Sequence, residues 1–260
     1  MRHAKRQQMT QQAAQRHVKK KQRSWALISG LAAFFFAGAL AFGGYQVLVH
    51  PETPLPREWN PTVPLRISDP VTPLTGWKLN RAAMDQAQCL ATLDGFASLQ
   101  PLDPLEESDQ CFIRDRVDLR GVGDARVFPI ETRCAIALRL AMWETHSVQP
   151  AAAEFLQTSV TAIDHIGSYN CRTIRTGNGS SPRMSTHATA DAIDIAGFQL
   201  ADGERIRLLA DWEPPGPKAE FLREVRDGAC EWFNLTLSPD YNRLHADHFH
   251  LQSRGWGLCR

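Results

Sequence analysis

Two short segments in the C-terminal half of the chain hold residues with the types and spacing of a metal site. Residues 185–196 contain His187 and, seven positions later, Asp194. Residues 245–251 contain four further polar candidates, His245, Asp247, His248 and His250. Two imidazoles and one carboxylate are a ligand set that Zn²⁺ takes when a fourth position stays open for water. The two segments therefore predict zinc chemistry.

The residues around Asp194 alternate as they do in a half-buried strand. Over residues 192–196, Ile193 and Ile195 point to one face, toward a core. Asp194 points to the other face, between two alanines. Because alanine is small, the carboxylate has the open surroundings that a metal ligand needs.

The second segment, residues 245–251, alternates in the same way. His248 and His250 share one face, and the apolar residues that follow each of them share the core face. Two such strands lying side by side would bring Asp194 and His250 within reach of one ion. His187, in the loop before the first strand, would then fold over the site.

The first segment resembles the SxHxxGxAxD signature of D-alanyl-D-alanine carboxypeptidases, dipeptidases and murein endopeptidases. Ala190 stands at the glycine position of that signature, and Asp194 matches its aspartate. The later His-x-x-His-x-His spacing resembles the second motif of the murein endopeptidases. Over about residues 76–260 the chain is also similar to the bacterial extensin-like C-terminal domain family, with landmarks at residues 167–172, 187–194 and 241–251.

These resemblances imply a ligand set and a substrate class. His187, Asp194 and His250 would hold one Zn²⁺, the expected cofactor. The substrates would be D-amino-acid peptide bonds in the stem peptides of peptidoglycan. Outside residues 1–23 the chain carries 21 basic and 28 acidic residues, a balance that suggests no nucleic-acid partner.

The resemblance offers two candidates for the general base. Asp247 lies where the dipeptidases place a glutamate, and His248 lies where the murein endopeptidases place a second histidine. On a regular strand these neighbours face opposite ways, so both can act only if a bulge intervenes. His248 is favoured because it shares the face of His250.

Three more residues receive supporting roles. Arg172 is predicted to stabilise the oxyanion, with a simple ion pair as the alternative. Ser185 is expected to orient the loop that carries His187. His245 either supports the ligands or only begins the strand.

Two other functions stay open at this level. The domain could be a zinc-containing module that binds peptidoglycan peptides without cutting them. It could also be a structural protein of the cell envelope whose histidines are only packed. Bound metal would exclude the structural function. Digestion of peptidoglycan would distinguish a peptidase from a binding module.

Six cysteines follow the apolar N-terminal segment, at Cys89, Cys111, Cys134, Cys171, Cys230 and Cys259. Their even number, wide spacing and lack of a CxxC pair predict a disulfide framework, with six buried thiols as the alternative. Because shorter loops are favoured, the expected pairs are Cys89–Cys111, Cys134–Cys171 and Cys230–Cys259.

The N-terminal part predicts a membrane-anchored protein. Residues 1–23 hold eight Lys and Arg and no acid, as a cytoplasmic tail would. Residues 24–50 are expected to form one transmembrane helix of the inner membrane, with a cleaved signal peptide as the rival. Residues 51–75 contain seven prolines and are expected to be a stiff linker. Residues 76–260 would then form the periplasmic domain.

This domain is predicted to be α+β, with a small antiparallel sheet that carries the zinc site and is flanked by helices. Helices are expected over residues 80–100, 132–146, 150–165 and 217–228. Strands are expected over residues 127–130, 171–175, 192–196, 204–209 and around His248 and His250.

Overall fold

The computed structural model describes residues 29–177 and 179–260. The chain divides into two compact units, with the boundary between Thr62 and Val63. The predicted basic tail, residues 1–23, lies outside the described residues, as does the start of the predicted membrane helix.

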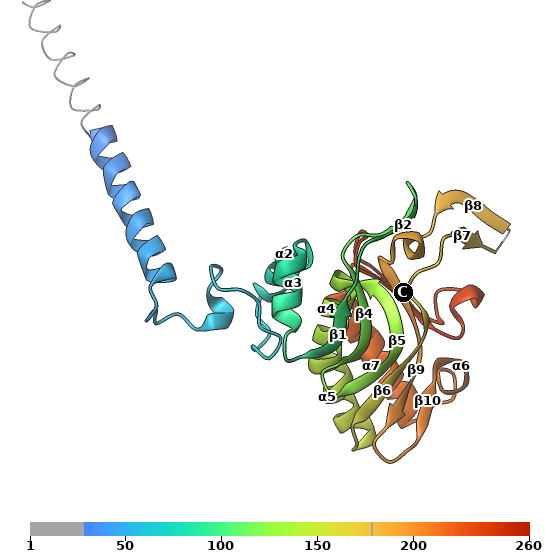
Figure 1. Cartoon of the computed structure of the whole chain (residues 1–260). Coiled ribbons are helices and arrows are strands. Elements are labelled where there is room, and N and C mark those ends of the chain that lie inside the picture. The colour runs from blue at the N-terminus through green and yellow to red at the C-terminus, as the bar shows by residue number, and fades with distance from the viewer. Residues whose placement is uncertain (1–28, 178) are drawn as a thin grey trace, which may run out of the picture. The chain divides into compact units, whose positions relative to one another are not determined.

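The first unit contains one long apolar helix, Ser29–Val49 (Figure 1). Its length and composition allow it to cross a membrane, and a signal sequence would pass the same test. Asn60 Nδ2 and Thr62 Oγ1 both donate to the carbonyl of Leu48, at 2.7 and 3.2 Å. Because carbonyls at a helix C-terminus lack helical partners, these two bonds cap the helix.

The linker prediction requires that the proline-rich segment stay outside the packed core, but part of the segment enters the core. Leu65 and Ile67 are buried, and Ile67 is fully inaccessible. Burial of such side chains contributes roughly 1.5–3 kcal/mol each, which is enough to hold a short segment in place. The second unit therefore begins at Val63 and not near Gly76.

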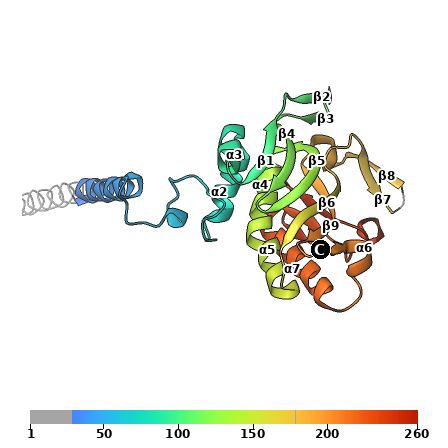
Figure 2. The same ribbon diagram turned by 60° about the horizontal axis from the view of Figure 1, so that its bottom comes forward.

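The second unit is built on a nine-stranded mixed sheet in the order β1-β4-β5-β6-β9-β12-β11-β13, with β10 paired to β9 (Figures 1 and 2). The strands of this sheet are β1 Ala97–Pro101, β4 Arg116–Val122, β5 Ala125–Arg133, β6 Val160–Gly167, β9 Ala192–Leu200, β10 Arg205–Arg207, β11 Leu235–Leu237, β12 Phe249–Gln252 and β13 Leu258–Cys259. Two separate hairpins are formed by β2 Leu105–Ser108 with β3 Cys111–Ile113, and by β7 Thr173–Thr176 with β8 Gly179–Met184.

The α+β class is confirmed, but the prediction of a small antiparallel sheet is wrong. β5 and β6 are parallel, and so are β11 and β13. The helices between β5 and β6 form the crossover that a parallel pair needs. The sheet is therefore larger and of mixed direction.

Helices α4, α5 and α7 cover one face of the sheet (Figure 2). The α-helices of this unit are α2 Thr75–Ala83, α3 Gln86–Leu93, α4 Cys134–Trp143, α5 Gln149–Ala151, α6 Leu208–Asp211 and α7 Pro217–Trp232. Shorter helical turns are η1 Arg57–Trp59 in the first unit, then η2 Glu144–Val148, η3 Ala152–Leu156, η4 Thr186–Thr189 and η5 Arg243–His245. Every residue of α4 is buried, so this helix forms the centre of the core.

Two of the predicted helices are wrong in extent. The helix expected over residues 150–165 ends at Leu156, and Gln157 then takes a left-handed conformation with φ 54°. The β-branched residues that follow favour a strand, and Val160 and Ile163 enter the core from β6. The helix expected over residues 80–100 is interrupted at Asp85, whose side chain caps α3.

The other predicted helices and strands agree more closely with the structure. α7 begins at Pro217 as expected and runs four residues past the predicted end, to Trp232. The helix expected over residues 132–146 is present from Cys134 and continues into η2. The strand expected over 204–209 is β10, which gives way to α6 at Leu208.

Three disulfides confirm the predicted framework, but only one predicted pairing is right. Cys230 pairs with Cys259, whereas Cys89 pairs with Cys134 and Cys111 pairs with Cys171. Cys134 begins α4, which packs against α3 where Cys89 lies. Loop length was a poor guide because packing between elements decides which thiols meet.

Candidate metal centre

His187 is held by hydrogen bonds on both its backbone and its ring. Ser185 caps η4, and its hydroxyl accepts from the backbone N–H of His187 at 3.3 Å. His187 Nδ1 donates to the carbonyl of Ser168 at 2.6 Å. Because a carbonyl only accepts, Nδ1 carries the ring hydrogen, and Nε2 of the neutral ring is left with a free lone pair.

The turn after His187 depends on a left-handed residue. Ala190 ends η4 with φ 48° and ψ 28°, and its side chain is fully buried. This is the position of the signature's glycine, which takes such a conformation without a steric penalty. Alanine keeps the same turn at a cost of about 1–2 kcal/mol.

Asp194 and His250 face each other from neighbouring antiparallel strands. The register of β9 and β12 places them directly opposite one another. Ile193 and Ile195 on either side of Asp194 are fully buried in the core. Alternation of the strand then directs the carboxylate to the opposite face of the sheet, as predicted.

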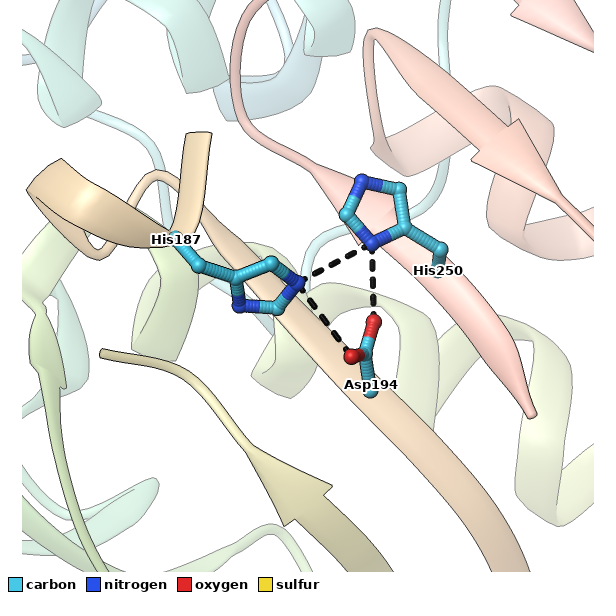
Figure 3. A group of neighbouring side chains, drawn as sticks. All are labelled: His187, Asp194 and His250. Carbon is cyan, nitrogen blue, oxygen red and sulfur yellow. Dashed lines mark hydrogen bonds and ion pairs between the residues drawn. The ribbon is translucent and has the colours of Figure 1, made fainter. Parts of the chain in front are cut away.

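The three side chains converge on one point (Figure 3). His187 Nε2 lies 3.2 Å from His250 Nδ1 and 3.2 Å from Asp194 Oδ2, and His250 Nδ1 lies 2.8 Å from Asp194 Oδ1. Ligand atoms of a tetrahedral zinc site, at about 2.0–2.1 Å from the ion, are roughly 3.3 Å apart. The spacing of the cluster fits such an ion.

The electrostatics of the cluster also fit a cation. Burial opposes ionisation of Asp194, but hydrogen bonds and attraction to His187 and His250 outweigh it and hold the pKa of the carboxyl well below its usual range. Burial lowers the pKa of His250, despite the opposing effect of Asp194. The cluster thus presents an anion and a neutral imidazole, the forms that bind metals.

One contact in the cluster requires a positive charge between its two atoms. His187 Nε2 faces Asp194 Oδ2 at 3.2 Å, while Nδ1 of the same ring already donates to Ser168. The contact is attractive when a proton or a metal ion lies between the two atoms. The geometry therefore offers the same place to a proton or to a bound cation.

A family described as Extensin-like protein C-terminus matches residues 87–260. The chain belongs to this family. The match includes both segments of the cluster and all six cysteines. No curated protein matches the chain, and no solved structure matches it.

In this extensin-like domain, the side chains of the two candidate bases are hydrogen-bonded to each other. His248 Nδ1 donates to Asp247 Oδ1 at 2.7 Å, and His248 Nε2 lies 3.6 Å from Asp194 Oδ1. The expectation that the two side chains face opposite ways is wrong, because β12 begins only at Phe249 and the two residues precede it in a turn. His248 therefore keeps a free Nε2 beside the cluster.

His245 lies against the same group of rings. Its ring centroid is 5.2 Å from that of His248 and 5.8 Å from that of His250. Its Nδ1 donates to the side-chain oxygen of Asn242 at 2.8 Å. Burial, with repulsion from the two neighbouring rings, lowers the pKa of His245 to about 4. His245 is therefore a neutral packing partner of the cluster at neutral pH.

Arg172 lies beside the cluster's supporting loop. Its backbone carbonyl accepts from the N–H of Ser185 at 3.0 Å. Its guanidinium donates to the carbonyl of Thr173 at 3.3 Å. Within the described part of the chain, no hydrogen bond or ion pair joins this guanidinium to the three clustered residues.

Sequence reasoning missed two residues that orient the ligands. Ser168 is buried, its carbonyl receives the hydrogen bond from His187, and its hydroxyl donates to the carbonyl of Ala192 at 2.7 Å. The amide of Gln252 contacts His250 Nε2 at 2.7 Å. Strand alternation could have revealed Gln252, which lies two residues after His250 on the same face. No spacing rule marks Ser168.

Asp191 is a third residue that sequence reasoning missed, and its buried charge joins the segments that carry the ligands. Its carboxylate pairs with Arg133 Nη1 and with Arg254 Nε at 2.5 and 2.9 Å. Its carbonyl accepts from the N–H of Ser253 at 2.9 Å. These bonds join the start of β9 to the ends of β5 and β12, so they fix the position of Asp194 relative to His250.

Proposed function

We propose that this extensin-like domain is a zinc-dependent peptidase that acts on the stem peptides of peptidoglycan. The observation that carries the proposal is the convergence of His187 Nε2, Asp194 and His250 Nδ1 within a few ångströms. The likeness of residues 185–194 to the signature of the D-alanyl-D-alanine peptidases supports the substrate class. When bound, Zn²⁺ would polarise the scissile carbonyl and lower the pKa of a water molecule.

The residues around the cluster supply the proton transfers. His248 Nε2 takes the proton from the attacking water and returns it to the leaving amine. Asp247 keeps the hydrogen of His248 on Nδ1 and stabilises the charged ring that forms, since it accepts a 2.7 Å bond there. Arg172, which carries a permanent positive charge beside the loop of His187, is assigned to the developing oxyanion.

The location follows from two features of the chain. Three disulfides are stable in an oxidising compartment outside the cytoplasm. The helix Ser29–Val49 follows a basic segment, so we assign it as an inner-membrane anchor with a cytoplasmic N-terminus. The domain then lies in the periplasm. The helix has the inner membrane as its partner, and the domain has peptidoglycan.

Digestion of purified peptidoglycan tests the proposal. The unit Val63–Arg260, which has its own core, is incubated with zinc and with peptidoglycan sacculi, and the muropeptides are separated by chromatography. We expect new muropeptides from the native protein and none from a His250→Ala variant. An unchanged profile from a zinc-loaded protein would instead indicate a zinc-containing wall-binding module, and a protein without zinc would indicate a structural role.

A further inference from the structure

The hairpin β7–β8 and its flanks carry charge of one sign. Residues 170–186 contain three arginines and no Asp, Glu or Lys. Arg175 and Arg183 are exposed, and among the described residues neither guanidinium has an ion-pair partner. Two cations on one short hairpin make a surface that attracts anions.

The base of this hairpin is fixed to the loop that carries His187. The carbonyl of His187 accepts from the N–H of Asn170, and the carbonyl of Arg172 accepts from the N–H of Ser185, both at 3.0 Å. Cys171, next to the hairpin, is held by its disulfide to Cys111. The two strands project from this fixed base, away from the main sheet (Figure 1). The base of the hairpin therefore lies beside the loop of His187, and its exposed arginines lie farther along the two strands.

The neighbouring hairpin has the opposite charge. The stretch 103–113, which includes β2 and β3, contains four acids and no Lys or Arg: Asp103, Glu106, Glu107 and Asp109. The Cys111–Cys171 disulfide ties this hairpin to the base of β7–β8. An anionic group of a ligand is repelled by β2–β3 and attracted by β7–β8, so the charges orient it.

We infer that the hairpin β7–β8 binds a free carboxylate of the peptide that occupies the candidate metal centre. This inference rests on the proposed function and narrows its substrate class to peptides with an ionised carboxyl group near the scissile bond. Guanidinium groups form paired hydrogen bonds with carboxylates and are suited to this task. Because the two arginines are solvent-exposed, we expect an effect of about tenfold on affinity and not a larger one.

The test compares one peptide in two forms. A synthetic stem peptide that ends in D-alanine is prepared as the free acid and as the amide, and its binding to the zinc-loaded full chain in detergent is measured by calorimetry. The variant is Arg175→Gln with Arg183→Gln, and the matched control is Arg205→Gln, an exposed arginine on β10. Zinc content is measured for each protein.

We expect the native chain and the Arg205→Gln control to bind the acid about tenfold more tightly than the amide. The double variant should bind both forms equally, with its zinc content unchanged. Equal affinity of the native chain for both peptides, a preference that survives in the double variant, or no binding of either peptide would overturn the inference. Binding does not require turnover, so a chain that discriminates without cutting upholds the inference while the peptidase proposal fails.

Discussion

Asp194 and His250 occupy directly paired positions on β9 and β12, and their Oδ1 and Nδ1 atoms are 2.8 Å apart. The register between two buried strands is strongly specified, because a slip of either strand by one residue would move its core-facing side chains to the opposite face of the sheet. The candidate metal centre therefore does not depend on a mobile loop for these two groups.

This relationship separates the roles of two neighbouring histidines. His250→Ala removes a group at the centre of the cluster, so we expect loss of bound zinc. His248→Ala removes a ring that lies outside the three converging groups, so zinc should stay bound while hydrolysis is lost. Metal analysis of the two purified variants checks this, and equal zinc loss in both would refute the assignment.

The hydrogen bond between Asp247 and His248 predicts a purely kinetic defect. Asp247→Asn leaves a neutral group beside Nδ1, so the ring loses the partner that stabilises its charged form. We expect kcat to fall by roughly 10–100-fold with zinc content unchanged, as for other residues that orient a catalytic group. Asp202→Asn, at an exposed aspartate before β10, is the matched control. A native kcat in the Asp247 variant would remove this residue from the mechanism.

The left-handed Ala190 predicts a stabilising substitution. Ala190→Gly relieves a strain of about 1–2 kcal/mol, although glycine also makes the unfolded chain more flexible. We expect the free energy of unfolding to rise by up to about 1 kcal/mol in urea titrations. Ala192→Gly, on the regular strand β9, should lower it instead. If both substitutions destabilise the domain to the same extent, the strain at Ala190 is not real.

Buried histidines predict that acid destabilises the metal-free domain. Burial lowers the pKa of His245 to about 4 and also lowers the pKa of His250. In the unfolded chain both titrate near 6.5, so below this pH the unfolded state binds more protons than the folded state. The free energy of unfolding must then fall as pH decreases from about 6.5 toward 4. Urea titrations in EDTA measure it, and His245→Gln should reduce the slope. Stability that rises toward pH 5 would contradict this prediction.

The sequence anticipated the strand of Asp194 and the face that each of its residues occupies, because period-2 alternation is a local signal. It also anticipated α7, which opens at Pro217. The helix predicted over residues 150–165 is too long, because the helical conformation ends before Gln157, which is left-handed. The parallel pairing of β5 with β6 was not foreseeable, since it depends on how a crossover packs.

The sequence predicted the three residues that converge, His187, Asp194 and His250. It did not predict all of the residues that hold them in place. Ser168 and Asp191 act through contacts with residues distant in sequence, which no local spacing reveals. The pairing of Asp247 with His248 was missed for a different reason. It requires that the strand begin one residue after His248, and strand boundaries are poorly marked by local patterns.

The zinc content of the purified unit Val63–Arg260 at neutral pH tests the central claim most directly. After dialysis against zinc and then against metal-free buffer, elemental analysis should find about one zinc ion per chain, since the cluster offers a single set of three converging ligands. The same protein with Asp194→Ala should retain none. A folded native domain that holds no zinc under these conditions would contradict the account.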